Sequence, residues 1–213
     1  LSWSTGETGC ADGAPKIKYD GKHDPIVKFA GNRIEMQGFF IDTVGSAISA
    51  TSFSGTRSGI TLTYCTLNMD GDQEDTARTD KGIGVNYGQS VNYLSANYCK
   101  FIGQSTNTSN WFYVGDDGGG GTVEHVILNN NYIRNSKSDL QLNNSIKNIL
   151  YSNNTFYNTW DSSYFSDPYY GYFLIEEPTD DALNVIRGIT LTHNTFNNST
   201  GSAPKEFGAL IAN

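Results

Sequence analysis

Residues 149–156 read Ile149-Leu-Tyr151-Ser-Asn-Asn154-Thr-Phe156, and their pattern recurs along the 213-residue chain. Two apolar residues stand two positions apart, Asn or Cys comes three positions after the second, and another apolar residue comes two positions later. Four more segments share this pattern and another fits it less well: residues 60–67, 94–101, 126–133 and 189–196, with 34–41 as the weaker copy. Such a recurring unit indicates a repeat protein.

The pattern describes two short strands joined at a corner. Apolar residues two positions apart lie on one face of a strand. The alternation then slips by one position, so the chain must turn between the two strands. Asn at such a corner tolerates a left-handed backbone and can hydrogen-bond along a stack of like residues. We therefore predict a structural ladder at this corner, formed by Cys65, Cys99, Asn131, Asn154 and Asn194.

Two of the three cysteines hold the corner position in consecutive copies, so we expect Cys65 and Cys99 to be neighbours. The third, Cys10, belongs to no copy, and the chain shows neither a CxxC motif nor a Cys/His metal spacing. Whether Cys65 and Cys99 are bonded to each other stays open at this point.

The spacing of the copies indicates a solenoid with insertions. Their last apolar residues stand at positions 41, 67, 101, 133, 156 and 196, so the intervals are 26, 34, 32, 23 and 40 residues. A coil of fixed size with loops of different length produces such intervals. Propeller blades need a more regular period, and an up-and-down barrel needs hairpin turns. We predict an all-β, right-handed parallel β-helix (solenoid) with long loops inserted between coils, forming a single domain over residues 1–213.

Composition supports this class and excludes others. The chain has 23 Gly and 22 Asn, only 17% charged residues and 13% aromatic residues, which argues against both intrinsic disorder and a helical bundle. The net charge of −8 and the absence of any basic run make nucleic acid a poor partner. No segment has the roughly 18 uninterrupted apolar residues of a membrane span.

Two stretches in the middle of the chain read Val91-Asn-Tyr-Leu-Ser-Ala-Asn-Tyr-Cys99-Lys-Phe-Ile-Gly-Gln-Ser105 and His125-Val-Ile-Leu-Asn-Asn-Asn131-Tyr-Ile133. Each resembles a coil of the chondroitinase B and alginate lyase family of right-handed β-helix polysaccharide lyases. The resemblance covers roughly residues 80–156. The resemblance implies an extracellular protein, secreted or on the cell surface, whose partner is a polysaccharide. It also implies β-elimination beside a uronic acid as the family's chemistry.

The catalytic residues of that family are not matched in this chain. Calcium is held there by an Asn and two Glu, and Asn154 is the counterpart of the Asn. Tyr172 and Leu174 stand where the two Glu are expected, and Thr179 or its neighbour stands where the catalytic Lys is expected. Asn213 occupies the place of the Arg. Whether the protein is an enzyme therefore stays open: it is either a lyase with displaced machinery or a non-catalytic binder.

The longest insertions, residues 68–89, 103–122 and 158–184, are the expected places for a binding site. In the first, a carboxylate cluster could supply part of the oxygen shell of a calcium ion, although its spacing is not that of an EF-hand. This candidate metal site consists of Asp70, Asp72, Glu74 and Asp75. The alternative is an ordinary solvated acidic loop.

The third insertion is rich in aromatic residues. Flat rings present apolar surface to a pyranose, while Tyr hydroxyls and neighbouring polar groups bond its edge. The carbohydrate-binding candidates are Trp160, Tyr164, Tyr169, Tyr170 and Tyr172. The alternative is that these rings only pack the loop. Acid pairs that could serve a glycoside hydrolase, a further alternative, are Asp116–Asp117, Glu176–Glu177 and Asp180–Asp181.

We predict an extracellular, carbohydrate-directed β-helix protein, polysaccharide lyase-like, that binds or cleaves an acidic polysaccharide. The alternative is a non-catalytic structural or adhesive β-helix, such as a phage tailspike portion, a surface adhesin or a fibre subunit. The chain begins without Met and ends on Ile211-Ala-Asn213, which reads as a strand. We therefore expect a portion of a longer chain, with further coils, a capping segment or a homo-oligomer contact at the C-terminal end.

Overall fold

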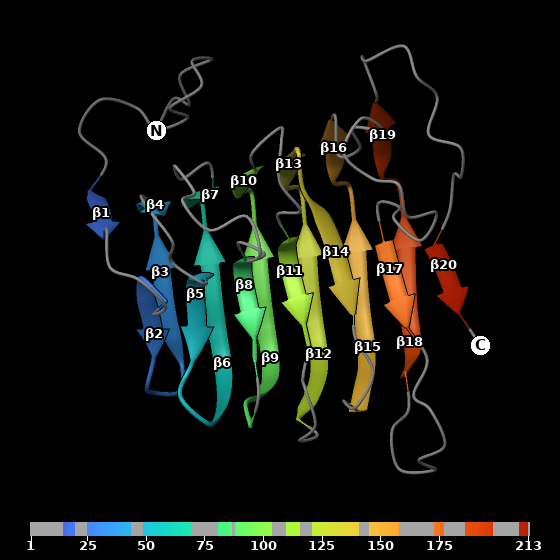
Figure 1. The fold of residues 1–213 in the computed structure, drawn as a ribbon, viewed down its shortest axis with the longest axis horizontal. Helices are drawn as coiled ribbons and strands as arrows, with labels where there is room; N and C mark the ends of the chain where they lie inside the picture. Colours follow the sequence, from blue (N-terminus) through green and yellow to red (C-terminus); the bar gives the residue numbers. More distant parts are fainter. Residues whose placement is uncertain are drawn as a thin grey trace.

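The computed structural model describes eleven segments, residues 15–19, 25–43, 49–69, 81–86, 88–103, 110–115, 121–140, 145–157, 173–176, 186–197 and 209–212. Within these segments the chain forms twenty strands and no helix. The strands make three parallel sheets that run side by side along the long axis of the molecule (Figure 1).

The three sheets are named A, B and C. Sheet A consists of β1 (Lys16–Tyr19), β4 (Phe40–Thr43), β7 (Thr66–Met69), β10 (Lys100–Gly103), β13 (Tyr132–Arg134), β16 (Thr155–Tyr157) and β19 (Thr195–Asn197). Sheet B consists of β2 (Val27–Phe29), β5 (Ser49–Phe53), β8 (Lys81–Val85), β11 (Asn110–Val114), β14 (Lys137–Leu140), β17 (Phe173–Glu176) and β20 (Ala209–Ala212). Sheet C consists of β3 (Ile34–Gln37), β6 (Thr56–Thr63), β9 (Ser90–Asn97), β12 (Thr122–Asn129), β15 (Ser145–Ser152) and β18 (Ile186–Thr192).

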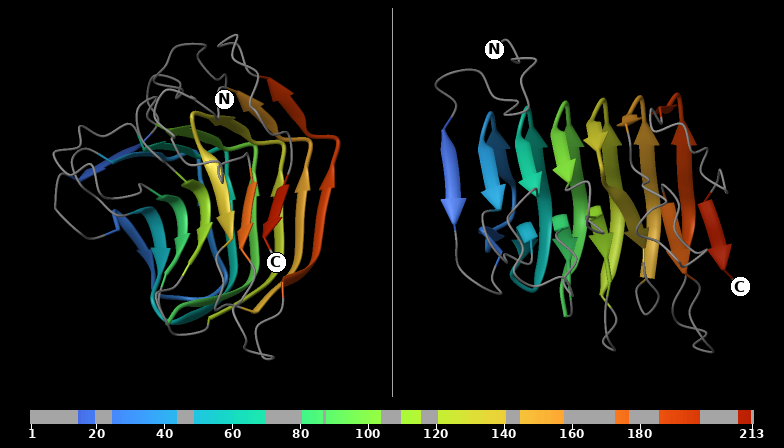
Figure 2. Two further views of the ribbon diagram at one scale, coloured as in Figure 1. Left: turned by 45° about the vertical axis from the view of Figure 1, so that its right-hand side comes forward. Right: turned by 45° about the horizontal axis from the view of Figure 1, so that its top comes forward.

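The chain visits sheets C, A and B in turn, and each strand pairs in parallel with the strand three places further along the sequence. One circuit through the three sheets is therefore one coil, and successive coils stack, as the turned views show (Figure 2). This connectivity defines an all-β parallel β-helix, the predicted fold class.

The repeat copies superpose in this solenoid. The first apolar residues of all six copies stand opposite one another in neighbouring strands of sheet C: Ile34, Ile60, Leu94, Val126, Ile149 and Ile189. The weaker copy at residues 34–41 therefore takes the same place in its coil as the other copies do in theirs. The predicted corner lies between sheets C and A, because β6 ends at Thr63 and β7 begins at Thr66.

The prediction that residues 68–89, 103–122 and 158–184 are loops was wrong in part. Each of these stretches contains a strand of sheet B, namely β8, β11 or β17. The apolar alternation failed to reveal β8 and β11 because both are buried along nearly their whole length. Strands covered on both faces lack the period of two. What varies between coils is thus the connection before or after sheet B.

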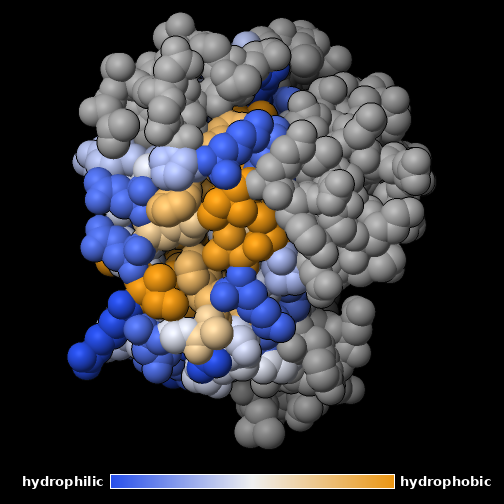
Figure 3. Space-filling view, turned by 90° about the vertical axis from the view of Figure 1, so that its left-hand side faces the viewer, coloured by the Kyte–Doolittle hydropathy of each residue, from blue (hydrophilic) through white to orange (hydrophobic). Residues whose placement is uncertain are grey.

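The interior between the sheets is packed with apolar side chains. Viewed from the β1 end, hydrophobic residues occupy the middle of the molecule with hydrophilic residues beside them (Figure 3). Trp111 lies at the centre, with its ring 5.1 Å from Phe101, 5.7 Å from Tyr151 and 5.8 Å from Phe156. A Cβ atom added to Gly82 would lie 2.7 Å from the carbonyl oxygen of Trp111, so only glycine fits beside this residue. Each ring buried here stabilises the fold by about 1.5–3 kcal/mol.

No helix in the described segments is long and apolar enough to cross a membrane.

Candidate functional site

Every long strand of sheet C contains one residue with a left-handed backbone before its second half. Tyr93, His125 and Asn148 have φ values of 55°, 55° and 56°, while Gly59 and Gly188 have 72° and 70°. The residues on either side of them are paired across the strands, so these five form one row that crosses the coils. Arg33, with φ 56°, begins the same row before β3. We call these six residues the bend row.

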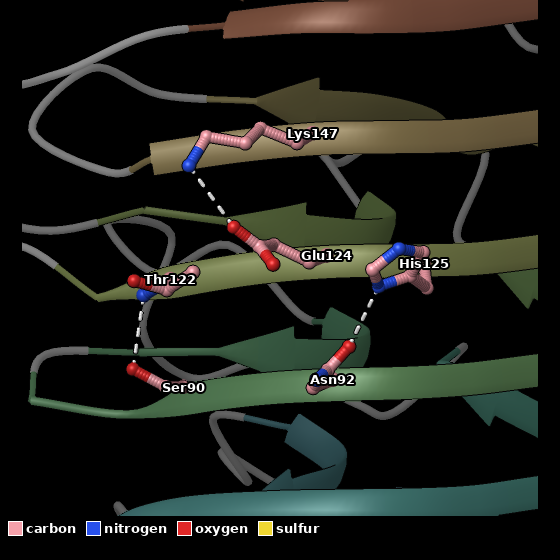
Figure 4. Close-up of polar contacts among 6 residues, drawn as sticks. All are labelled: Ser90, Asn92, Thr122, Glu124, His125 and Lys147. Carbon is pink, nitrogen blue, oxygen red and sulfur yellow. Dashed lines mark hydrogen bonds and ion pairs between the residues drawn. The ribbon is translucent and has the colours of Figure 1, made fainter.

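The bend row holds two exposed, stacked rings. The rings of Tyr93 and His125 lie 4.8 Å apart with an interplanar angle of 13°, and 59% of Tyr93 is exposed. Asn92 Oδ1 lies 2.9 Å from His125 Nδ1 (Figure 4). Because an amide oxygen only accepts, Nδ1 is the donor in this contact. The result is a fixed, flat aromatic surface that faces solvent.

Charged side chains flank the stacked rings across the same strands. Lys147 Nζ lies 3.0 Å from Glu124 Oε1, and each of these side chains is about one quarter exposed, at 26%. Such a partly solvated ion pair adds little to stability, about 0–1 kcal/mol. Farther along the strands, the backbone N–H of Thr122 donates to Ser90 Oγ at 2.9 Å. The strands on either side of the bend row therefore carry hydrogen-bonding groups and both charges near the stacked rings.

A second left-handed row lies at the corner between sheets C and A. Its members are Tyr64, Tyr98, Asn130, Asn153 and His193, with φ values between 52° and 55°. The rings of Tyr64 and Tyr98 stack at 5.2 Å, and 48% of Tyr98 is exposed. The left-handed residue at this corner is thus the one before the ladder residue. Our expectation had linked the left-handed backbone to the ladder Asn itself.

The predicted ladder residues come together at this corner, on the inner side of the chain. Asn154 Oδ1 accepts hydrogen bonds from the backbone N–H and the Nδ2 of Asn131, at 3.0 and 3.1 Å. Asn154 Nδ2 donates to the carbonyl of Leu128 at 2.8 Å and to Asn194 Oδ1 at 3.0 Å. Asn131 Oδ1 accepts from the backbone N–H of Cys99 at 2.9 Å. Asn131 and Asn154 are buried, so these hydrogen bonds satisfy groups that water cannot reach.

Cys65 and Cys99 are free thiols, which answers the question of their bonding. Cys65 Sγ donates to the carbonyl of Met36 at 3.4 Å, as the ladder Asn side chains donate to the preceding coil. Cys99 Sγ lies 3.4 Å from the carbonyl of Asn97. A hydrogen bond from Cys99 lowers the pKa of Cys65 to about 7. Burial raises the pKa of Cys99 well above its ordinary value.

Sheet B presents on its outer side a cation that was not among the candidates predicted from the sequence. Lys81 Nζ lies 3.6 Å above the ring of Tyr113 and 2.8 Å from Asn86 Oδ1. Gln89 Oε1 accepts from Ser52 Oγ and from the backbone N–H of Asn86, both at 3.0 Å. These contacts fix the ammonium group in position by a cation–π interaction and a hydrogen bond. Lys81 stands between Asp80 and Gly82 and belongs to no motif by which sequence reasoning could have selected it.

The loop candidates lie outside the described residues. They are the acidic cluster Asp70, Asp72, Glu74 and Asp75, the aromatic residues Trp160, Tyr164, Tyr169, Tyr170 and Tyr172, and the acids Asp116, Asp117, Glu177, Asp180 and Asp181. The segments that the structure describes contain no group of three or more His, Cys, Asp or Glu that could hold a metal ion.

Asn154, the counterpart of the family's calcium-binding Asn, does not fit that role in this chain. It is buried, its Oδ1 already accepts two hydrogen bonds from Asn131, and its Nδ2 donates two more. Calcium needs oxygen atoms that can turn towards it. The side chain of Asn154 is therefore a structural element, and calcium at the Asp70 cluster stays a prediction.

No family model, curated protein or solved structure matches this chain. The resemblance to the chondroitinase B type thus has no support from these comparisons. The class of protein rests on the topology of the three parallel sheets, which defines a parallel β-helix.

Proposed function

We propose that this chain is an extracellular, carbohydrate-directed β-helix protein that binds polysaccharide through the bend row of sheet C. The observation on which this rests is the stacked pair Tyr93 and His125, exposed and held at a left-handed φ. Binding, rather than cleavage, is the activity that these groups support.

The backbone conformation of Tyr93 and His125 indicates that their rings serve a purpose other than folding. A left-handed conformation costs a non-glycine residue about 1–2 kcal/mol, and neighbouring coils place Gly59 and Gly188 at the same position. Stacking of the two rings stabilises the fold by about 0.5–1.5 kcal/mol, which offsets only part of this cost. Glycine in place of Tyr93 or His125 would therefore give a fold of at least equal stability. Residues held in such conformations tend to mark functional sites.

The chemistry of the bend row suits a saccharide. The ring of Tyr93 offers an apolar face to the C–H groups of a pyranose, while Asn92, Glu124 and Lys147 can bond its hydroxyl groups. A polysaccharide repeats along its length, as the coils do, so a rigid solenoid can present contacts to several sugar units. The resemblance of residues 80–156 to polysaccharide lyases points to the same class of partner.

A binding survey with polysaccharides tests the proposal. The protein is incubated with alginate, chondroitin, pectin and neutral plant and microbial glucans, and retention is measured by affinity electrophoresis and calorimetry. Absorbance near 232 nm is followed in parallel, because unsaturated uronates from a lyase reaction absorb there. We expect binding to at least one polysaccharide. If neither binding nor any product is detected, including new reducing ends, the structural or adhesive role is the one that remains.

The site itself is tested with Tyr93→Gly, compared with Arg33→Gly in the same row. Both changes put glycine at a left-handed φ, but only the first removes an exposed ring. We expect Tyr93→Gly to weaken binding about tenfold, which corresponds to about 1.4 kcal/mol, and Arg33→Gly to change it less than twofold. Equal binding by both variants would contradict the assignment of the site.

A further inference from the structure

Most of the large hydrophobic side chains that are exposed in the described segments lie on the outer side of sheet C. There are four in these segments, and three of them are Tyr93, Tyr98 and Ile127, exposed by 59%, 48% and 46%. Ile127, on β12, stands between the buried Val126 and Leu128, so it points outward. Tyr93 belongs to β9, which pairs with β12, and Tyr98 directly follows β9. The three side chains therefore lie near one another on the same surface.

This surface is the part of sheet C between the bend row and the left-handed row at the corner, which we call the corner row. In β6, β9, β12, β15 and β18 it comprises residues 60–63, 94–97, 126–129, 149–152 and 189–192. These residues include no Asp, Glu, Lys or Arg. We call this surface the neutral panel.

The outward side chains of the neutral panel are hydroxyl, amide and aliphatic groups. Ser95 Oγ donates to Thr61 Oγ1 at 3.2 Å, and Ser152 Oγ donates to Asn129 Oδ1 at 3.0 Å. The outward row that crosses the middle of the panel consists of Thr61, Ser95, Ile127, Leu150 and Thr190. The panel thus offers apolar surface and uncharged hydrogen-bonding groups side by side.

Charged residues lie outside the neutral panel. β9, which carries the ring of Tyr93, contains none. Glu124 and Lys147 precede the bend row and are paired with each other at 3.0 Å (Figure 4). Arg187 stands next to Lys147 on β18, and Lys100 lies beyond the corner, in sheet A. An anionic group on the panel would lose water without a cation there to replace it, and the net charge of −8 would repel an anionic polymer.

Tyr93 and Tyr98 mark two opposite borders of the neutral panel. Tyr93, in the bend row, stacks on His125, and Tyr98, in the corner row, stacks on Tyr64. The two residues are five positions apart in the sequence, so their Cα atoms are about 16 Å apart along the strand. A single pyranose is too short to contact both rings. A chain of several sugar units can do so.

We propose that the neutral panel binds an uncharged polysaccharide whose chain runs along β9 from Tyr93 to Tyr98. This inference rests on the proposed function and assigns the substrate class, a neutral glycan rather than the acidic one that the sequence resemblance implies. The two rings stack against sugar faces, and Ile127 adds apolar surface between them. The hydroxyl and amide groups of the panel bond the sugar hydroxyls.

Two pairs of polymers, each with one backbone, test the preference for an uncharged chain. One pair is a mixed-linkage β-glucan and the same glucan oxidised at C6 to carboxylates. The other is highly methyl-esterified pectin and polygalacturonate. For each backbone that is bound, we expect the neutral member to bind at least tenfold more tightly at low salt, and added salt to narrow the difference.

The outcomes separate this inference from the proposed function. Retention by another uncharged polysaccharide, with none by the acidic ones, supports the inference as well. Equal or tighter binding of the charged members, or retention by acidic polysaccharides alone, would overturn the inference and leave the proposed function standing. Binding to no polysaccharide of either kind would contradict the proposed function itself.

Substitutions at Ile127 test whether the chain crosses the panel. Ile127→Lys places a cation there, and Ile127→Gln removes the same apolar surface without adding a charge. We expect Ile127→Lys to bind the charged member of a pair about tenfold more tightly than Ile127→Gln does, and the two variants to bind the neutral member within about twofold of each other. Equal affinity of both variants for the charged member would contradict this placement of the chain.

Oligosaccharides test the span between the two rings. Of the dimer and the hexamer prepared from the neutral polymer that binds, the hexamer should bind at least tenfold more tightly. Tyr98→Gly should weaken hexamer binding about tenfold and dimer binding less than twofold, because a dimer can still occupy Tyr93. The control is His193→Gly, which also puts glycine at a left-handed φ of the corner row but lies on the last coil, and it should change neither by more than twofold. An equal loss in His193→Gly, or equal affinity for the two lengths, would refute the proposed span.

Discussion

The ladder inside the corner and the bend row on the outside of sheet C are both repeated once per coil, yet they differ in kind. The ladder uses Asn in three consecutive coils, and its amides bond to one another and to the backbone of the neighbouring coil. The bend row changes from Gly59 to Tyr93 to His125 while the backbone conformation stays the same. Buried groups restrict which residue is acceptable, and exposed positions do not. The ladder therefore belongs to the fold, whereas the bend row is where we propose that a ligand binds.

The largest expected effect, and the strongest test of this comparison, comes from removing a ladder amide. Asn154→Ala would leave the carbonyl of Leu128, the N–H of Asn131 and the side chain of Asn194 without their partner. Each unsatisfied buried group costs about 1–3 kcal/mol, so we expect unfolding free energy to fall by about 3 kcal/mol or more. Chemical denaturation measures it. The control Asn148→Gly, in the bend row, should stay within about 0.5 kcal/mol of the wild type. Similar losses in both would mean that the two rows do not differ as described.

Glycines inside and outside the coil sharpen the same contrast. A Cβ at Gly82 would lie 2.7 Å from the Trp111 carbonyl oxygen and 2.9 Å from the ring of Phe101. We expect Gly82→Ala to destabilise the fold by about 1–3 kcal/mol through overpacking. A Cβ at Gly38 would have no atom within 4 Å, so Gly38→Ala costs only the strain of its φ of 73°, about 1 kcal/mol. Thermal unfolding of the two variants compares them, and a larger loss at Gly38 would contradict this packing.

The two cysteines give the ladder a dependence on pH that the Asn residues lack. The folded-state pKa of Cys65, about 7, lies below the ordinary value of 9.0, so its contribution to stability is full above pH 9 and is lost as pH falls through 7. We expect the free energy of unfolding to rise between pH 7 and 9. In Cys99→Ala the hydrogen bond that lowers this pKa most is absent, so the rise should become smaller. Denaturation at several pH values measures both proteins, and parallel curves would refute the coupling.

The smallest effect on stability is expected on the corner row. Tyr98→Gly relieves a left-handed φ of 55° but removes the stacking on Tyr64, and these terms nearly cancel. We expect the midpoint of thermal unfolding to shift by less than about 2 °C, the range of a 0.5 kcal/mol change in a chain of this length. A loss above 2 kcal/mol would show that these rings belong to the fold, as the ladder does.

Much of the fold was predictable because the ladder imposes residue types. Asn131 and Asn154 satisfy buried backbone groups, so their position in the pattern located the corner, and with it sheets C and A. The strands of sheet B were missed because β8 and β11 are buried along nearly their whole length and show no alternation. The free state of the cysteines depends on side-chain geometry that spacing does not contain.

The bend row was not predicted, although a signal for it exists. Gly59, Asn148 and Gly188 all stand directly before the first apolar residue of a copy, and Gly and Asn are the residues that most readily take a left-handed φ. Tyr93 hid this signal because tyrosine does not share that preference. Tyr93 and Ile127 lie 34 residues apart in the sequence, and only the pairing of β9 with β12 places them on neighbouring strands.

The bend row also bears on how this surface can change over time. Glycine, tyrosine, histidine, asparagine and arginine occupy equivalent positions there on one backbone conformation. A substitution at one coil therefore alters what the surface offers to a ligand without asking the neighbouring coils to readjust their main chain. Under the proposed function, the residues that contact a ligand on this face can therefore change one coil at a time.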